Sequence, residues 1–163
     1  MKKAVWSAVA TAAGMLLLST SVYAQTTATV AVNVNVNARA KLTITGGPVN
    51  FTDADPDVTA TLTSNALNIQ VQVRTAAAGN SSLTLAATGD LDNGGALIPI
   101  GDLDWAVTGP GYTAGTASTT AQNVGTWSGP GARTGTQTFT LPNSWDYVVG
   151  TYTTTLNYTL AVP

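Results

Sequence analysis

The stretch TVAVNVNVNARAKLTI, residues 29–44, decides the fold class of this chain. Its apolar residues share one parity: Val30, Val32, Val34, Val36, Ala38, Ala40, Leu42 and Ile44. Polar residues fill most of the other parity: Asn33, Asn35, Asn37, Arg39, Lys41 and Thr43. Because successive side chains of a strand point to opposite faces of the sheet, this alternation predicts a half-buried β-strand.

The predicted strand is longer than one domain of this size requires. From Val30 to Ile44 it would reach roughly 50 Å at about 3.3 Å per residue. A compact chain of this length has a radius of gyration of only about 14 Å. Two explanations stay open: the strand bends from one sheet to another within its own domain, or its first part completes the sheet of a neighbouring copy. In the second case the donor residues are Val30, Val32, Val34 and Val36.

The first residues have the layout of a secretory signal peptide. Lys2 and Lys3 precede an apolar stretch, and Val22-Tyr23-Ala24 suits cleavage before Gln25. The apolar stretch is too short and too interrupted to be a good membrane span. We therefore expect a protein secreted to a bacterial cell surface. Its expected parts are a signal peptide (1–24), an N-terminal arm (25–37) and one domain (38–163).

Shorter alternations recur along the rest of the chain, and turn-forming Gly, Pro, Asp and Asn residues separate them. They predict strands at 58–63, 67–74, 83–88, 103–108, 121–127, 135–141 and 151–162. Many short strands with regular turns are typical of an all-β domain. The expected fold is an antiparallel immunoglobulin-like β-sandwich with Greek-key connections, and an up-and-down barrel is the alternative.

The inventory of reactive side chains argues against an enzyme. The chain contains no His, Cys or Glu. The lack of His and Cys excludes Ser-His-Asp and Cys-His nucleophile systems. Of the six basic residues, Lys2 and Lys3 belong to the leader, which leaves four against eight aspartates. This balance provides no basic patch for phosphates, so we expect no nucleic-acid partner.

Two groups of residues are candidates for ligand binding. Asp53, Asp55 and Asp57 place carboxylates at alternate positions, which suits Ca²⁺, although the run lacks the rest of an EF-hand loop. The alternative is an Asp-rich turn whose side chains bond the nearby backbone. No other cofactor is expected. The second group is aromatic and could stack on a sugar or fill the core: Trp105, Trp127, Trp145, Tyr112 and Tyr147.

The alternating arm and the closing segment from Gly150 through Tyr152 and Tyr158 to Leu160 resemble bacterial fimbrial and spore-coat-like surface subunits. Chaperone–usher pilins commonly have a disulfide and a Tyr next to last, whereas this chain has no Cys and has Val162 there. The resemblance implies a structural, adhesive or polymerising role by β-strand addition. Its implied partners are further copies and an export or assembly machinery. The alternative function is a monomeric secreted carbohydrate- or calcium-binding module.

Overall fold

The computed structural model describes residues 26–162, and the predicted signal peptide lies outside them. The chain divides into a segment that ends at Val34 and a body that begins at Asn35. Residues 26–38 belong to no strand, and their side chains are exposed. Within one copy the predicted strand from Val30 to Ile44 is therefore shorter than expected, because β1 begins only at Arg39, and pairing of its first part with a neighbouring copy stays a prediction. A segment with alternating apolar and polar residues forms part of a sheet only where a neighbouring strand supplies hydrogen bonds to its backbone.

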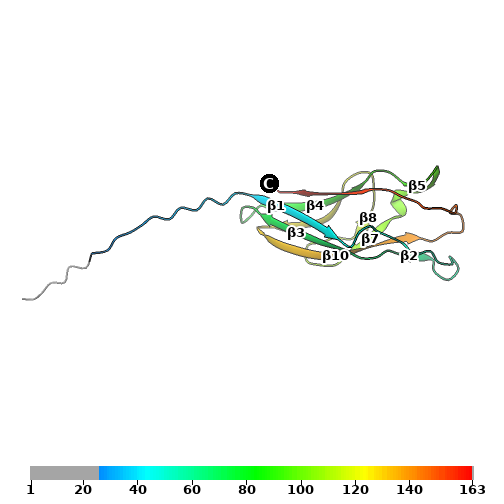
Figure 1. Ribbon diagram of the computed structural model, residues 1–163, viewed down its shortest axis with the longest axis horizontal. Coiled ribbons are helices and arrows are strands. Elements are labelled where there is room, and N and C mark those ends of the chain that lie inside the picture. Colours follow the sequence, from blue (N-terminus) through cyan, green and yellow to red (C-terminus); the bar gives the residue numbers. More distant parts are fainter. Residues whose placement is uncertain (1–25, 163) are drawn as a thin grey trace, which may run out of the picture. The chain divides into compact units, whose positions relative to one another are not determined.

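Six strands form the larger sheet: β1 (Arg39–Thr45), β2 (Thr61–Thr63), β3 (Leu67–Arg74), β7 (Asp104–Val107), β8 (Gly115–Thr116) and β10 (Gly131–Pro142). Their order is β1-β3-β10-β7-β8, with β2 paired to the far part of β10, and all the pairs are antiparallel. Figure 1 shows β1, β3 and β10 side by side.

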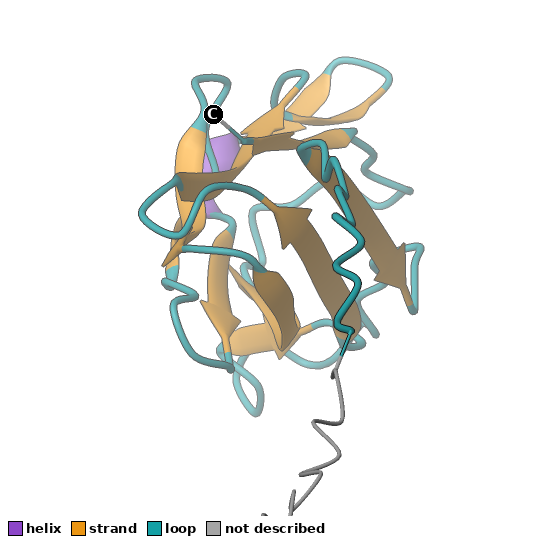
Figure 2. Cartoon of the chain, turned by 90° about the vertical axis from the view of Figure 1, so that its left-hand side faces the viewer, coloured by secondary structure: helices purple, strands orange, loops and turns teal. Residues whose placement is uncertain are grey.

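The smaller sheet has three antiparallel strands in the order β11-β4-β9: β4 (Asn80–Ala87), β9 (Gln122–Ser128) and β11 (Leu156–Ala161). A separate hairpin consists of β5 (Leu91–Asn93) and β6 (Ala96–Ile98), and the short 3₁₀ helix η1 (Ile100–Asp102) follows it. Strands dominate the body in Figure 2, where η1 is purple. The all-β, antiparallel prediction is thus confirmed, and the non-sequential strand order does not fit an up-and-down barrel.

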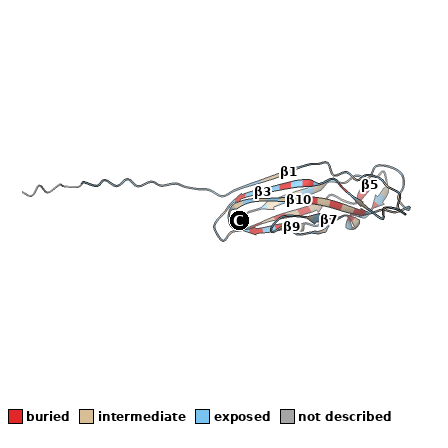
Figure 3. Ribbon diagram, turned by 90° about the horizontal axis from the view of Figure 1, so that it is seen from below, coloured by how far each residue is buried: buried red, intermediate tan, exposed pale blue. Residues whose placement is uncertain are grey.

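Most of the alternations after residue 60 lie on strands of the body. The closing strand is shorter than the expected 151–162, because residues 151–155 and Val162 lie outside β11, and of these only Thr153 forms an isolated bridge. Along β3 every second residue is buried, as the red and blue segments of Figure 3 show. The two sheets share one core, whose fully buried large residues include Phe139, Ile69, Leu83 and Leu85. This core, rather than any disulfide, stabilises the body.

A buried polar link crosses the core. The Tyr158 hydroxyl on β11 donates a hydrogen bond to Gln137 Oε1 on β10, and the two oxygens are 2.7 Å apart. Gln137 is fully buried, and its Nε2 has no hydrogen-bond partner among the described residues. Any other position of β11 would leave the buried Gln137 Oε1 without a donor, which is energetically costly. The link therefore fixes the position of the edge strand β11 relative to the larger sheet.

Tyr158→Phe should destabilise the body by about 1–3 kcal/mol, because it leaves Gln137 Oε1 buried without a donor. Tyr158→Phe with Gln137→Leu should recover most of that loss, because the double variant buries neither polar group. Urea denaturation of the three proteins measures the effect. A double variant that is less stable than Tyr158→Phe would contradict this account of the link.

Alkaline pH should weaken the fold through the same tyrosine. Burial raises the pKa of the Tyr158 hydroxyl above its ordinary value of 10.0, so the folded state resists deprotonation more than the unfolded chain does. The resulting stabilisation is complete below about pH 10 and is lost as the pH rises further. The free energy of unfolding should therefore fall above pH 10, and less steeply in Tyr158→Phe. Burial also raises the pKa of Tyr112 and Tyr147, so some decline should remain in that variant.

Candidate functional site

The two sides of the body differ in whether another segment of the chain hydrogen-bonds to the outermost strand of the sheet. At the edge of β9, the connection before β8 hydrogen-bonds to the strand: Thr113 N–H donates to the Val124 carbonyl (2.8 Å) and Thr126 N–H to the Gly111 carbonyl (2.9 Å). At the other side, β1 and β11 are the outermost strands of their sheets and lie next to each other. No strand within residues 26–162 pairs with their outer edges. We call this side the open seam.

Apolar side chains along the open seam are incompletely covered. On the central strands, inward residues such as Val71 and Leu83 have no exposed surface. On β1 and β11, by contrast, the inward residues pack against the core but keep part of their surface accessible. These half-buried residues are Leu42, Ile44, Leu156, Tyr158 and Leu160, and the half-buried Val162 directly follows β11. One more strand at the seam would cover this row and pair with either free edge.

Among residues 26–162, the predicted donor residues form a highly exposed apolar row. Val30 is 86% exposed and Val36 is 60% exposed, with Val32 and Val34 between these values. From Val30 to Val36 the row covers about the length of β1, which has seven residues, or of β11, which has six. The row therefore has the periodicity and the length of a strand that could fill such a seam.

The three candidate calcium ligands lie in the connection between β1 and β2, and the structure does not bring them together as a metal site. Asp55 Oδ1 accepts the backbone N–H of Asp57 (2.9 Å), and Asp57 Oδ1 accepts the indole N–H of Trp145 (3.1 Å). No group of three or more acidic side chains that could hold a metal ion occurs within residues 26–162. Asp55 thus makes the local turn contact that was the alternative to calcium binding.

The aromatic residues do not form one platform. Trp105 and Trp127 are buried, and their indole N–H groups donate to the carbonyls of Thr113 (2.9 Å) and Pro110 (2.8 Å). Tyr112 packs edge-on against Trp127, with ring centroids 4.8 Å apart. Trp145 differs from them, since 69% of its surface is exposed. Core packing therefore accounts for most of the aromatic set, and Trp145 is left as a surface residue.

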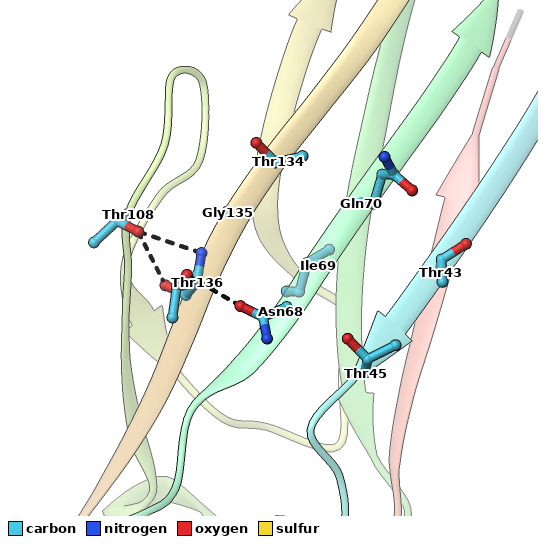
Figure 4. Close-up of a pocket in the computed structure, with 9 residues that line it drawn as sticks. All are labelled: Thr43, Thr45, Asn68, Ile69, Gln70, Thr108, Thr134, Gly135 and Thr136. Atoms are coloured by element: carbon cyan, nitrogen blue, oxygen red, sulfur yellow. Dashed lines mark hydrogen bonds between the residues drawn. The ribbon is translucent and has the colours of Figure 1, made fainter.

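The outer face of the larger sheet carries uncharged polar side chains around a shallow hollow of about 520 Å³ (Figure 4). Thr108 Oγ1 accepts the Thr136 backbone N–H and donates to the Thr136 carbonyl, while Thr136 Oγ1 donates to Asn68 Oδ1. Gly135 also lines the hollow, and a Cβ at this position would clash with the Thr108 carbonyl and the Tyr112 ring. These groups can form hydrogen bonds, and none of them titrates near neutral pH.

Sequence reasoning missed the open seam, because the half-burial of β11 depends on which strand lies beside it. It also missed the burial of Gln137, because this burial depends on the register of β10 and no sequence motif indicates it. Comparison with protein-family models and with curated proteins found no match for this chain. No helix within residues 26–162 has the length and apolar character that a membrane crossing needs.

Calcium should leave the stability of the protein unchanged. A site that binds only the folded state would raise the melting temperature by mass action, and the Asp55 and Asp57 carboxylates are instead engaged by Asp57 N–H and Trp145. Thermal unfolding in millimolar calcium and in excess chelator should give the same midpoint. A calcium-dependent rise that disappears in Asp53→Asn with Asp55→Asn would show that the three carboxylates do bind the ion.

Proposed function

We propose that this protein is a secreted structural subunit of a bacterial surface filament or coat, and that copies assemble by β-strand addition of the N-terminal arm, residues 25–37. In this proposal the arm of one copy fills the open seam of the next. The match between the exposed valine row and the half-buried seam carries the proposal. Secretion follows from the predicted leader at residues 1–24, and no catalytic role is proposed.

The energetics favour a strand that gains backbone hydrogen bonds as well as apolar contacts. Burying four valines is worth roughly 6–12 kcal/mol. Ordering about seven residues costs roughly 7–14 kcal/mol, so valine burial alone only balances the ordering. Ladder hydrogen bonds, at about 0.5–1.5 kcal/mol each, then decide the outcome, and the seam has unpaired edges on both β1 and β11 to supply them.

The surface of the arm also suits repeated self-association. Exposed edges and strands are normally protected by charge or proline, and the row from Val30 to Asn37 has neither. Asn33, Asn35 and Asn37 occupy the opposite face, where they would stay hydrated without repelling one another in successive copies. We further propose that the body has an immunoglobulin-like Greek-key topology, because the chain crosses between the sheets from β3 to β4, from β9 to β10 and from β10 to β11.

Charges placed on the valine face should block assembly while leaving the body folded. In the full chain, exported with its own leader, Val32→Asp with Val34→Asp would bury two carboxylates in the seam, which is strongly unfavourable. The matched control, Asn33→Asp with Asn35→Asp, adds the same charge to the opposite face. We expect the valine variant to be monomeric by size-exclusion chromatography and the control to form large species.

Two results would contradict arm donation. One is equal assembly of the valine variant and the control. The other is a valine variant that has lost its β-type circular dichroism spectrum, because the arm would then belong to the core of its own copy.

The second candidate function, a monomeric carbohydrate-binding module, is favoured by one observation. Trp145 is exposed, and its indole ring is oriented by the hydrogen bond to Asp57, as stacking on a sugar requires. Such a module would stay monomeric at high concentration, and glycans would raise its melting temperature.

A further inference from the structure

The charged residues of the body separate to its two ends. All four basic residues lie together on β1, β3 and β10: Arg39 pairs with Arg74, Lys41 with Gln72, and Arg133 with Val71. We call this the basic end. The eight aspartates lie toward the opposite end, in the connections and short elements there: Asp53, Asp55, Asp57, Asp90, Asp92, Asp102, Asp104 and Asp146. In Figure 1 β2 and β5 mark this second end of the body.

The arrangement at the basic end works against the stability of a single copy. Arg39 and Arg74 are directly opposite each other on neighbouring antiparallel strands. Like charges in this position destabilise a sheet. Because the aspartates lie toward the other end, the two arginines gain no compensation from them within their own copy. A partner with negative charge would relieve this repulsion.

The acidic end also carries the exposed apolar side chains of the body. Outside the arm, the large apolar residues that are exposed are Val58, Leu97, Trp145, Val148 and Val149. Hydrogen bonds join the segments that bear them: Trp145 Nε1 donates to Asp57 Oδ1 (3.1 Å), and Asn93 Nδ2 donates to the Val149 carbonyl (3.3 Å). We call this surface the acidic tip. Val149 is 98% exposed, so it contributes nothing to the core of its own copy.

A hollow at the basic end offers a surface of matching character. Its volume is about 570 Å³. Arg39, Lys41 and Arg74 supply positive charge, while the exposed Ala40 and Ala132 supply apolar lining. A tip that combines carboxylates with Trp and Val side chains complements both properties of this hollow.

We propose that the acidic tip of one copy docks onto the basic end of the next copy. The contact is head-to-tail, with different surfaces on the two partners, so it extends into a filament rather than closing as a dimer. This inference rests on the proposed assembly by arm donation and adds a second contact between neighbouring copies. The arm joins the body a few residues before Arg39, so both contacts involve the same end of the copy that donates its arm.

Charge reversal at each end provides the test, in the full chain exported with its own leader. One variant cancels the net charge of the basic end, by Arg39→Glu with Arg74→Glu, because two glutamates then lie beside Lys41 and Arg133. The other halves the net negative charge of the eight aspartates at the acidic end, from eight to four, by Asp53→Lys with Asp146→Lys, residues whose side chains bond nothing outside their own turns. Each variant alone should assemble about tenfold more slowly or worse than the unchanged chain, because the attraction between the two ends is weakened.

The results separate this contact from arm donation. If each charge variant assembles as fast as the unchanged chain while Val32→Asp with Val34→Asp stays monomeric, arm donation holds and the tip contact is overturned. Increasing salt should slow assembly of the unchanged chain, because screening weakens attraction between exposed charges.

Cysteine pairs locate the contact directly, because the natural chain contains no cysteine. A chain with Val149→Cys and Ala132→Cys should give a ladder of disulfide-linked species after mild oxidation. Val149→Cys alone should give few dimers, and abundant dimers would indicate a tip-to-tip contact and overturn the proposal. Trp145→Ala with Val149→Ser should slow assembly. If it assembles normally and loses binding on a glycan array, the tip is a carbohydrate surface instead.

Discussion

The pairing of β3 with both β1 and β10 is the interaction on which the larger sheet depends. β3 is the strand whose inward side chains are fully buried and whose two edges are both satisfied by long antiparallel ladders. Because the chain has no disulfide, these ladders and the core beneath them hold the body together. The position of β3 inside the sheet leaves β1 at its edge, and this edge is one wall of the open seam.

The open seam exists because only one of the two sides of the body has a segment that hydrogen-bonds to its edge strand. Beside β9 the connection around Tyr112 supplies backbone hydrogen bonds, so that edge needs no further strand. Beside β1 and β11 no comparable segment exists within residues 26–162, and the apolar residues of both strands stay half-exposed. An edge with free hydrogen-bonding groups and apolar surface attracts another strand. The proposed function takes the arm of a neighbouring copy as that strand.

The two ends of the body differ in charge and in exposed apolar surface. The basic residues gather beside the start of β1, and the aspartates gather with Trp145 and Val149 toward the other end. A body with unlike ends favours assembly in one orientation, because reversing one copy would bring like charges together. In the proposed assembly, such an arrangement would add a preferred orientation to strand addition.

By itself, the sequence determined the class of the fold and the faces of its main strands. The two-residue period of segments such as Leu67–Val73 requires a strand with one buried face, whatever lies next to it. The absence of His and Cys likewise limits the available chemistry, because no arrangement of the chain can supply a side chain that the composition lacks. Only the tertiary structure decided which strands are neighbours, since period-two patterns are compatible with many strand orders. It therefore decided that β1 and β11 are edges, that Gln137 meets Tyr158, and that Arg39 faces Arg74. These pairings join residues far apart in the chain, and no local pattern encodes them.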